Sequence, residues 1–188
     1  MIATPQSFYL TPEEYFIWEE QQEFKHEYID GEVFAMTGGT LPHNKVTLNL
    51  YSFLQAYLRL KKCTAFVADA KVGVSEAGPF FYPDLAVTCD PRDQTAVKFI
   101  QYPCLIAEAI SPSTEGRDRG AKFAHYRKIN TLQEYLLLDP TQINVELFRL
   151  NAQGKWELNS YGTGEEIYLE SVGVGVAIDL LYEDINLK

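Results

Sequence analysis

Two carboxylates, Asp84 and Glu108, lie in apolar surroundings in the middle of the chain. Asp84 directly follows Pro83 and precedes the apolar run 85–87, and Glu108 lies within the apolar segment 103–110. An ionised carboxylate in a buried strand is costly unless it is hydrogen-bonded, paired with a cation or bound to a metal. The two acids therefore call for a shared explanation.

Strand periodicity predicts how the two acids could meet. Along a strand through 103–110, Leu105, Ala107 and Ala109 would face one way, and Ile106, Glu108 and Ile110 the other. If this strand pairs with the one that Asp84 begins, the two acids converge near one end of a sheet. Such acids repel each other unless a hard cation such as Mg²⁺ or Mn²⁺ lies between them. The alternative is an Asp that only begins a strand and a Glu held in a salt bridge at a sheet edge.

The composition predicts one globular domain, residues 1–188, because 46% of the residues are hydrophobic and the length is sufficient for a full core. No run of eighteen apolar residues occurs, so we expect no membrane-spanning segment, and the first residues lack the features of a signal peptide. Cys63, Cys89 and Cys104 are odd in number and have no CxxC spacing, which argues against a disulfide scaffold or a structural zinc site. We therefore expect a cytoplasmic protein.

The formal net charge of −10 argues against indiscriminate nucleic-acid binding, because Lys and Arg supply most of that affinity. Positive charge is nevertheless concentrated between residues 117 and 128, where only Asp118 opposes it. The basic residues there are Arg117, Arg119, Lys122, Arg127 and Lys128. This segment is either a solvated helix face or a nucleic-acid surface, with Arg117, Arg119 and Lys128 as the candidate contacts.

The first part of the chain contains two elements that could supply further site residues. Asp30-Gly31 predicts a hairpin turn, and Glu27 just before it either points towards the carboxylates or is a solvated edge residue. A helix is predicted over 42–61 from apolar residues recurring every three or four positions. His43 lies in its first turn, as a capping or surface residue or as a ligand.

The remaining elements are mostly strands. We predict a strand over 66–74, a helix over 117–129 and a strand over 134–139. A hairpin then joins 143–150 to 156–161, and short β segments are expected at 166–169 and 176–181. This order predicts an α/β (α+β) core with a mixed sheet.

Four segments together resemble a known family. Pro83-Asp84 followed by an acid inside a strand is similar to the core of the PD-(D/E)XK nucleases. More closely, residues 26–32 (HEYIDGE), Pro83-Asp84, residues 108–114 (EAISPST) and Lys122 with Tyr126 resemble the bacterial Uma-type family of restriction-endonuclease-like proteins. The resemblance covers roughly residues 8–182. It implies a restriction-endonuclease-like core with flanking helices and a C-terminal β-hairpin extension.

The resemblance implies roles for individual residues. Asp84, Glu108 and the main-chain carbonyl of Ala109 would hold a divalent cation, Mg²⁺ or Mn²⁺, and Glu27 would assist. The ion would polarise a phosphate and help to deprotonate a water. These nucleases normally carry a lysine two residues after the second acid, where this chain has Ile110.

Two other lysines could replace the missing one. Lys122, from the following helix, looks like the replacement, and Lys71 is a weaker candidate. Such a lysine would orient the water or stabilise the charge that develops on the phosphate.

The function that the resemblance implies is a Mg²⁺-dependent DNA endonuclease. A homodimer is expected by analogy, because nucleases of this class often need two active sites to cut both strands. One alternative is a nuclease-fold protein with weak or no catalysis that acts as a nucleic-acid-binding or accessory module. Another is a hydrolase that uses two carboxylates without a metal, as in glycoside hydrolysis.

Overall fold

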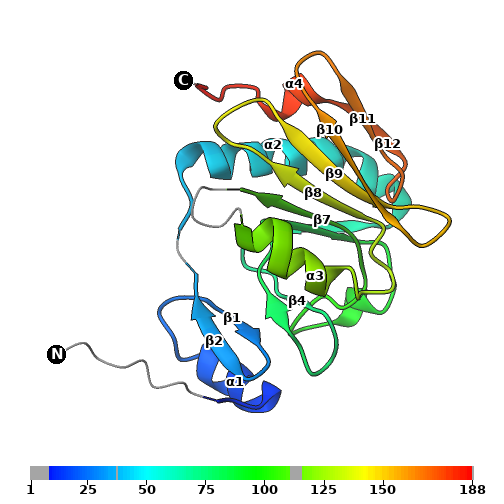
Figure 1. Ribbon diagram of the computed structural model, residues 1–188. Coiled ribbons are helices and arrows are strands. Elements are labelled where there is room, and N and C mark those ends of the chain that lie inside the picture. The colour runs from blue at the N-terminus through cyan, green and yellow to red at the C-terminus, as the bar shows by residue number, and fades with distance from the viewer. Residues whose placement is uncertain (1–8, 37, 111–115, 188) are drawn as a thin grey trace.

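A six-stranded mixed sheet forms the centre of the computed structural model, which describes residues 9–36, 38–110 and 116–187 (Figure 1). In spatial order its strands are β10 (Trp156–Tyr161), β9 (Val145–Leu150), β8 (Glu134–Leu138), β7 (Pro103–Ala109), β6 (Leu85–Thr88) and β3 (Thr64–Val67). Only β7 and β8 pair in parallel; the other neighbours in this sheet are antiparallel. Every residue of β7 and β8 is buried, as expected for apolar strands at the centre of a covered sheet.

Helices cover the two faces of this sheet (Figure 1). On one face α2 (Leu41–Leu58) packs Val46, Leu50 and Leu54 against the side chains of alternate β7 residues. On the other face the helical segment η3 (Arg117–Lys122) and α3 (Phe123–Tyr126) form the connection from β7 to β8. Leu105, Ala107 and Ala109 belong to the first cluster, and Ile106 and Ile110 to the second. The alternation predicted for 103–110 is therefore confirmed, and Glu108 lies on the face that η3 and α3 cover.

A smaller sheet carries Glu27. Its order is β2 (Glu32–Ala35), β1 (His26–Ile29), β5 (Phe80–Phe81) and β4 (Val72–Gly73), and α1 (Pro12–Glu19) packs on it through buried aromatic residues. The hairpin predicted at Asp30-Gly31 is confirmed. Both turn residues have positive φ, +49° and +94°, as the two-residue turn that matches strand twist requires.

The last elements form a two-stranded sheet of β11 (Glu166–Leu169) and β12 (Val174–Ala177), followed by α4 (Ile178–Leu181). The β segment predicted over 176–181 is wrong from Ile178 onwards. Ile178 and Leu181 are three residues apart, and both are buried as one turn of helix. Two short 3₁₀ turns, η1 (Arg59–Lys61) and η2 (Asp93–Thr95), complete the described elements.

The strand predicted over 66–74 is also wrong, because the chain leaves the sheet in its middle. β3 ends at Val67, and β4 belongs to the smaller sheet. Ala68 adopts a positive φ of +55°, and its N–H donates to the carbonyl of Asp84. Positive φ is uncommon for alanine, and no Gly or Pro marks this turn in the sequence.

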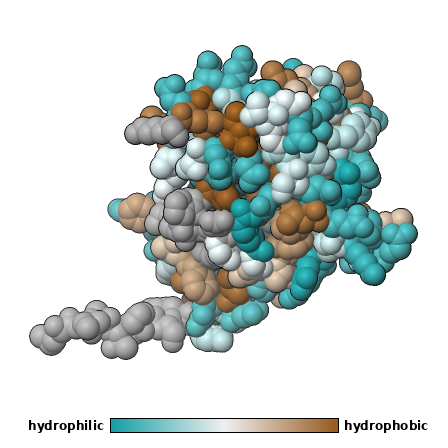
Figure 2. Space-filling model, turned by 45° about the horizontal axis from the view of Figure 1, so that its top comes forward, coloured by the Kyte–Doolittle hydropathy of each residue, from teal (hydrophilic) through white to brown (hydrophobic). Residues whose placement is uncertain are grey.

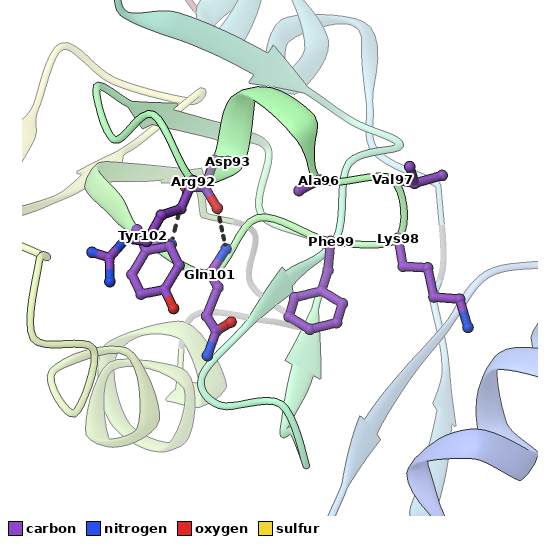
Figure 3. A pocket seen from close by; sticks show the side chains of 8 residues that line it. All are labelled: Arg92, Asp93, Ala96, Val97, Lys98, Phe99, Gln101 and Tyr102. Atoms are coloured by element: carbon purple, nitrogen blue, oxygen red, sulfur yellow. Dashed lines mark hydrogen bonds between the residues drawn. The ribbon is translucent and has the colours of Figure 1, made fainter.

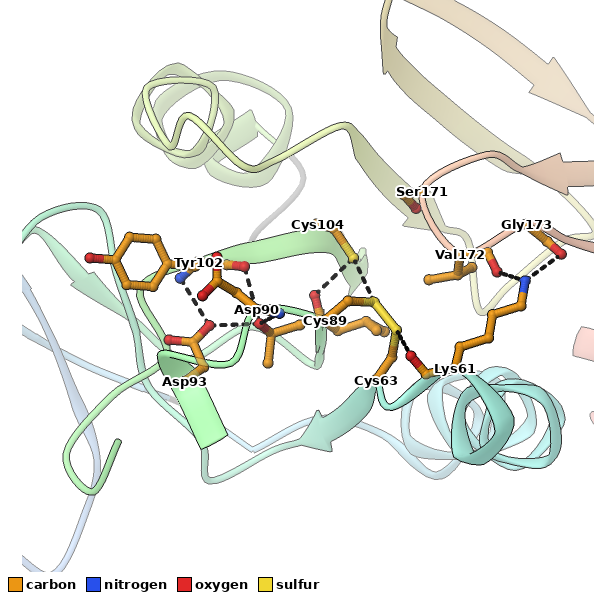
Figure 4. Close-up of a disulfide and its surroundings, with 12 residues drawn as sticks. Lys61, Cys63, Cys89, Asp90, Asp93, Tyr102, Cys104, Ser171, Val172 and Gly173 are labelled. Atoms are coloured by element: carbon orange, nitrogen blue, oxygen red, sulfur yellow. Dashed lines mark hydrogen bonds between the residues drawn. A yellow bond between two sulfur atoms is a disulfide. The ribbon is translucent and has the colours of Figure 1, made fainter. Parts of the chain in front are cut away.

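A disulfide joins Cys63 to Cys89, so the expectation drawn from cysteine number and spacing was wrong (Figure 4). β3 and β6 are antiparallel, and Thr64 pairs with Thr88, which places the two cysteines opposite each other one position further out. Cys104 is a free, buried thiol whose Sγ lies 3.8 Å from that of Cys89. The cysteine argument for a reducing compartment therefore no longer holds.

Within residues 9–36, 38–110 and 116–187, no helix has the length and apolar character needed to cross a bilayer. On the face shown in Figure 2, the coloured apolar residues occur in separate groups between hydrophilic ones. That face therefore shows no single extended apolar patch of the kind that marks a large interface.

The disulfide predicts the thiol chemistry and part of the stability of the protein. Thiol titration of the air-oxidised, denatured chain should find one free thiol, and titration after reduction should find three. Cys63→Ser should lower the free energy of unfolding by about 3 kcal/mol, because the crosslink restricts the unfolded chain over a separation of 26 residues. Cys104→Ser is the matched control and should keep the disulfide. Three free thiols before reduction would contradict this pairing.

Candidate active site

Asp84 and Glu108 meet where β6 and β7 pair. The two strands are antiparallel and Leu85 pairs with Ala107, so Asp84, one residue before Leu85, lies opposite Glu108, one residue after Ala107. The N–H of Asp84 donates to Glu108 Oε2 at 3.4 Å, and the N–H of Ala109 donates to Asp84 Oδ2 at 2.7 Å. The Asp84 side chain is 26% exposed, whereas that of Glu108 is 4% exposed. Asp84 is therefore the acid that reaches solvent.

Lys122 lies among buried carboxylates. Its Nζ is 3.0 Å from Glu108 Oε1, 3.0 Å from Glu27 Oε1 and 3.5 Å from Asp118 Oδ1. All four side chains are less than a tenth exposed. The structure thus brings together the four residues that the sequence analysis singled out, Glu27, Asp84, Glu108 and Lys122, and adds Asp118 to them.

The local helix geometry explains why Lys122 points inwards. η3 is a π-helical turn, which accommodates one residue more per turn than an α-helix and so changes which positions face the sheet. Lys122 and Asp118 are buried, while the neighbouring Phe123 is half-buried. Tyr126 is on the same side, and its hydroxyl donates to Glu108 Oε1 at 3.2 Å.

Lys71 occupies a different environment. Its Nζ lies 5.2 Å from the ring centres of Tyr15 and Phe16 and 5.3 Å from that of Tyr82. Burial lowers the pKa of Lys71, although nearby Glu19 and Glu20 oppose the shift. Of the two lysines proposed from sequence, Lys122 is therefore the one in contact with the acids.

The pKa values show that negative charge is crowded here. Burial raises the pKa of Glu108 to about 8. The nearby charges of Asp84, Asp118 and Glu27 also raise this pKa, whereas the charge of Lys122 lowers it. Burial also raises the pKa of Asp84, against the effect of His43. Burial alone would lower the pKa of Lys122, but the surrounding carboxylates outweigh it and hold the pKa above its usual value. The lysine is charged and only partly offsets the acids.

The donor set fits a hard divalent cation. Asp84 and Glu108 provide carboxylate oxygens next to each other. Burial raises the pKa of both, so a bound cation would favour their ionised forms. Among the described residues, no three His, Cys, Asp or Glu side chains are already grouped as a complete metal cage. Holding an ion therefore needs a main-chain carbonyl, water or a small movement of a side chain. Ala109 is adjacent to Asp84, so the carbonyl prediction remains compatible with the fold.

The sequence analysis missed one site neighbour and left another undecided. His43 Nε2 lies 3.3 Å from Asp84 Oδ2, a contact that a histidine in a first helical turn does not reveal. Asp118 was noted only as the acid that opposes the basic segment. Its spacing of four residues from Lys122 was the available signal, since such residues lie on one side of a helix.

The basic residues proposed as nucleic-acid contacts fall into three cases. Arg119 pairs with Glu146 of β9. Lys128 is exposed beyond the end of α3. The side chain of Arg117 lies outside the described part of the structure. The DNA contact predicted for all three stays a prediction.

The surface also has a hollow of about 250 Å³ (Figure 3). It is lined by η2 and the loop that leads to β7, including Arg92, Lys98, Phe99 and Tyr102. Asp93 accepts hydrogen bonds from the N–H groups of Gln101 and Tyr102, which explains the shape of this loop without a ligand. None of the clustered acids lines the hollow.

Comparison with known proteins identifies relatives over most of the chain. The model of the Uma2 family, described as "Putative restriction endonuclease", matches residues 12–180. The uncharacterized Synechocystis protein slr1290 is 39% identical over 176 residues, which covers 94% of this chain and 93% of that protein. A second, sll1609, is 35% identical over 163 residues, covering 86% of this chain and 92% of its own length.

A solved structure has the same fold. The crystal structure of a putative nuclease from Anabaena variabilis superposes with a TM-score of 0.74, and the match covers 92% of this chain and 97% of that one. The sequence identity is 18%, so this likeness concerns the fold alone. Together with the family match it confirms the predicted restriction-endonuclease-like fold.

The raised pKa of Glu108 predicts a pH-dependent stability. Between about pH 4.5 and about pH 8 the unfolded chain has lost this proton while the folded chain keeps it, so the free energy of unfolding falls as pH rises. Glu108→Gln should flatten that slope and leave stability at pH 8 level or higher. Urea denaturation at pH 5 and pH 8, with a chelator present, measures both effects.

Glu134→Gln is the matched control for this experiment. Glu134 is also fully buried in a strand, but it accepts bonds from Arg149, Ser171 and the N–H of Glu170. Its substitution should cost about 1–3 kcal/mol at both pH values, because it weakens bonds to a charged, buried group. An equal loss in the two variants would show that Glu108 is an ordinary structural acid.

Proposed function

The chain belongs to the Uma2 family of restriction-endonuclease-like proteins, and from this premise we propose that it is a metal-dependent endonuclease that hydrolyses phosphodiester bonds of DNA. The observation that carries the proposal is the position of the Lys122 ammonium, which contacts Glu108 beside the partly exposed Asp84. The two acids lie at the ends of neighbouring strands, and a charged lysine from η3 lies beside them. These are the groups that metal-assisted phosphodiester cleavage requires.

Asp84, Glu108 and the carbonyl of Ala109 would hold the ion, Mg²⁺ or Mn²⁺. When bound, it would polarise the phosphate and lower the pKa of a water. Lys122 is held charged, so it would act as a hydrogen-bond donor and a positive charge for the phosphate oxygens and not as a free base.

Other side chains would hold the reacting groups in position. Glu27 and Asp118 fix the Lys122 ammonium from two different elements, β1 and η3. Tyr126 donates to the same Glu108 oxygen that Lys122 contacts, which leaves Glu108 Oε2 on the Asp84 side. The carboxylate is thereby oriented with one oxygen towards the lysine and one towards Asp84.

DNA would be contacted through phosphates. Lys128 and Arg117 belong to the basic segment 117–128, which follows β7 in the chain. Arg119 pairs with Glu146, so it would either break this ion pair or contact phosphate from its present position. A homodimer would supply a second active site for the second strand. The overall charge of −10 favours contact through this limited segment over contact across the whole surface.

Asp84→Asn tests the proposed reaction. The change removes the acid that reaches solvent, so binding of Mg²⁺ and Mn²⁺ measured by calorimetry and cleavage of plasmid DNA should both be lost. Burial of Asp84 is unfavourable without a cation, so stability should stay level or rise. Asp90→Asn, beyond the opposite end of β6, is the control and should retain both. Metal binding and DNA cleavage that survive Asp84→Asn would refute the proposal.

Lys122→Ala separates the two candidate lysines. Loss of one oriented donor should reduce the cleavage rate on the order of a hundredfold or more, with Mg²⁺ affinity roughly retained. Lys71→Ala is the matched control and should have a much smaller effect, because Lys71 contacts aromatic rings. Single-turnover cleavage of a plasmid measures the rates, and circular dichroism checks the fold. The reverse ranking would transfer the catalytic role to Lys71.

A further inference from the structure

His43 is held in place by the first turn of α2. Thr40 caps the helix, and its Oγ1 accepts a bond from the N–H of His43 at 3.4 Å. The carbonyl of His43 accepts a bond from the hydroxyl of Thr47, one turn later, at 3.1 Å. The backbone that carries the imidazole is therefore fixed from both sides.

The imidazole ring is also fixed. Its Nε2 lies 3.3 Å from Asp84 Oδ2, and its Nδ1 lies on the side of Gly39. A Cβ at position 39 would lie only 2.7 Å from His43 Nδ1, so a side chain there would displace the ring. The side chains of His43 and Asp84 are both partly exposed, at 19% and 26%. Those of Glu27, Glu108 and Asp118 are at most 4% exposed.

We propose that His43 is a nitrogen ligand of the divalent cation at Asp84, and that it shifts the preference of the site from Mg²⁺ towards Mn²⁺ and other first-row divalent ions. This inference rests on the proposed function, because it concerns the same metal. It adds one ligand to the set of Asp84, Glu108 and the carbonyl of Ala109. No three such side chains among the described residues are already grouped around one point, so a side chain must move for His43, Asp84 and Glu108 to bind one ion together.

The separation of the two atoms fits shared coordination. Two ligand atoms that each lie about 2.1 Å from one ion, at an angle of about 100°, are about 3.2 Å apart, close to the 3.3 Å between His43 Nε2 and Asp84 Oδ2. Lys122 approaches the acids from the helices on one sheet face, and His43 from α2 on the other. The lysine side already holds a cation, which leaves the His43 side of Asp84 for the metal.

Ligand chemistry then sets the preference. Mg²⁺ favours oxygen ligands and binds imidazole poorly, whereas affinity for a nitrogen-containing site rises from Mn²⁺ along the first-row series. A site with oxygen ligands alone would distinguish these ions less. The imidazole therefore provides a reason for the site to select a transition metal.

Pulsed electron paramagnetic resonance of Mn²⁺ bound to the full chain tests the inference. A coordinated imidazole should give ¹⁴N modulation in the wild-type protein, and His43→Ala should abolish it. Calorimetry with MnCl₂ and MgCl₂ should show an Mn²⁺ affinity lowered at least tenfold in His43→Ala, with a smaller loss for Mg²⁺. Gly39→Ala, which keeps the imidazole but displaces it, should lower Mn²⁺ affinity in the same direction.

His125→Ala is the matched control, because the His125 ring contacts Phe81 and not the acids. It should keep both the ¹⁴N signal and the Mn²⁺ affinity. Bound Mn²⁺ without ¹⁴N modulation, or with modulation that survives His43→Ala, would overturn the role of His43 and leave the nuclease proposal standing. Failure of the wild-type chain to bind either ion would overturn the nuclease proposal as well.

Discussion

The contact of one ammonium with three buried carboxylates constrains the whole arrangement. Glu27 comes from the smaller sheet, Glu108 from the central strand β7 and Asp118 from the connection that leads to β8, and all three lie within 3.5 Å of Lys122 Nζ. Removing the ammonium from such a group is costly, since it leaves buried carboxylates without compensation. The two sheets and the crossover are therefore held in one relative position by electrostatics as well as by apolar packing.

The central sheet contains two buried glutamates whose environments differ. Glu134, in β8, is saturated by a guanidinium, a hydroxyl and two backbone N–H groups. Glu108, in the adjacent β7, shares Lys122 with two other acids and has its pKa raised to about 8. Both are acids in apolar strand sequences, so burial alone does not identify a reactive group. Glu108 differs in its raised pKa and in its position beside a second acid, Asp84, two features that are typical of reactive groups.

The sequence predicted what short-range patterns determine. The Asp30-Gly31 turn follows from turn chemistry, the side of the sheet on which Glu108 lies from strand alternation, and the contact of Lys122 with the acids from the family resemblance. It did not predict features that depend on register or on unusual backbone. The Cys63–Cys89 bond follows from the pairing of β3 with β6, the inward Asp118 from a π-turn and the break after Val67 from a positive φ at Ala68. Of these three features, only the position of Asp118 has a signal in the sequence, namely its spacing of four residues from Lys122.

The topology explains how a lysine from a helix can serve a site whose strand has Ile110 in the usual position. β7 and β8 are parallel, so the chain must cross over one face of the sheet between them, and η3 and α3 form this crossover. Glu108 faces the same side, which brings the crossover directly against it. Ile110 is then free to pack in the apolar cluster with Tyr126, which in turn orients Glu108 through its hydroxyl. The Lys122 ammonium thus lies twelve residues after position 110 in the chain and 3.0 Å from the second acid, Glu108.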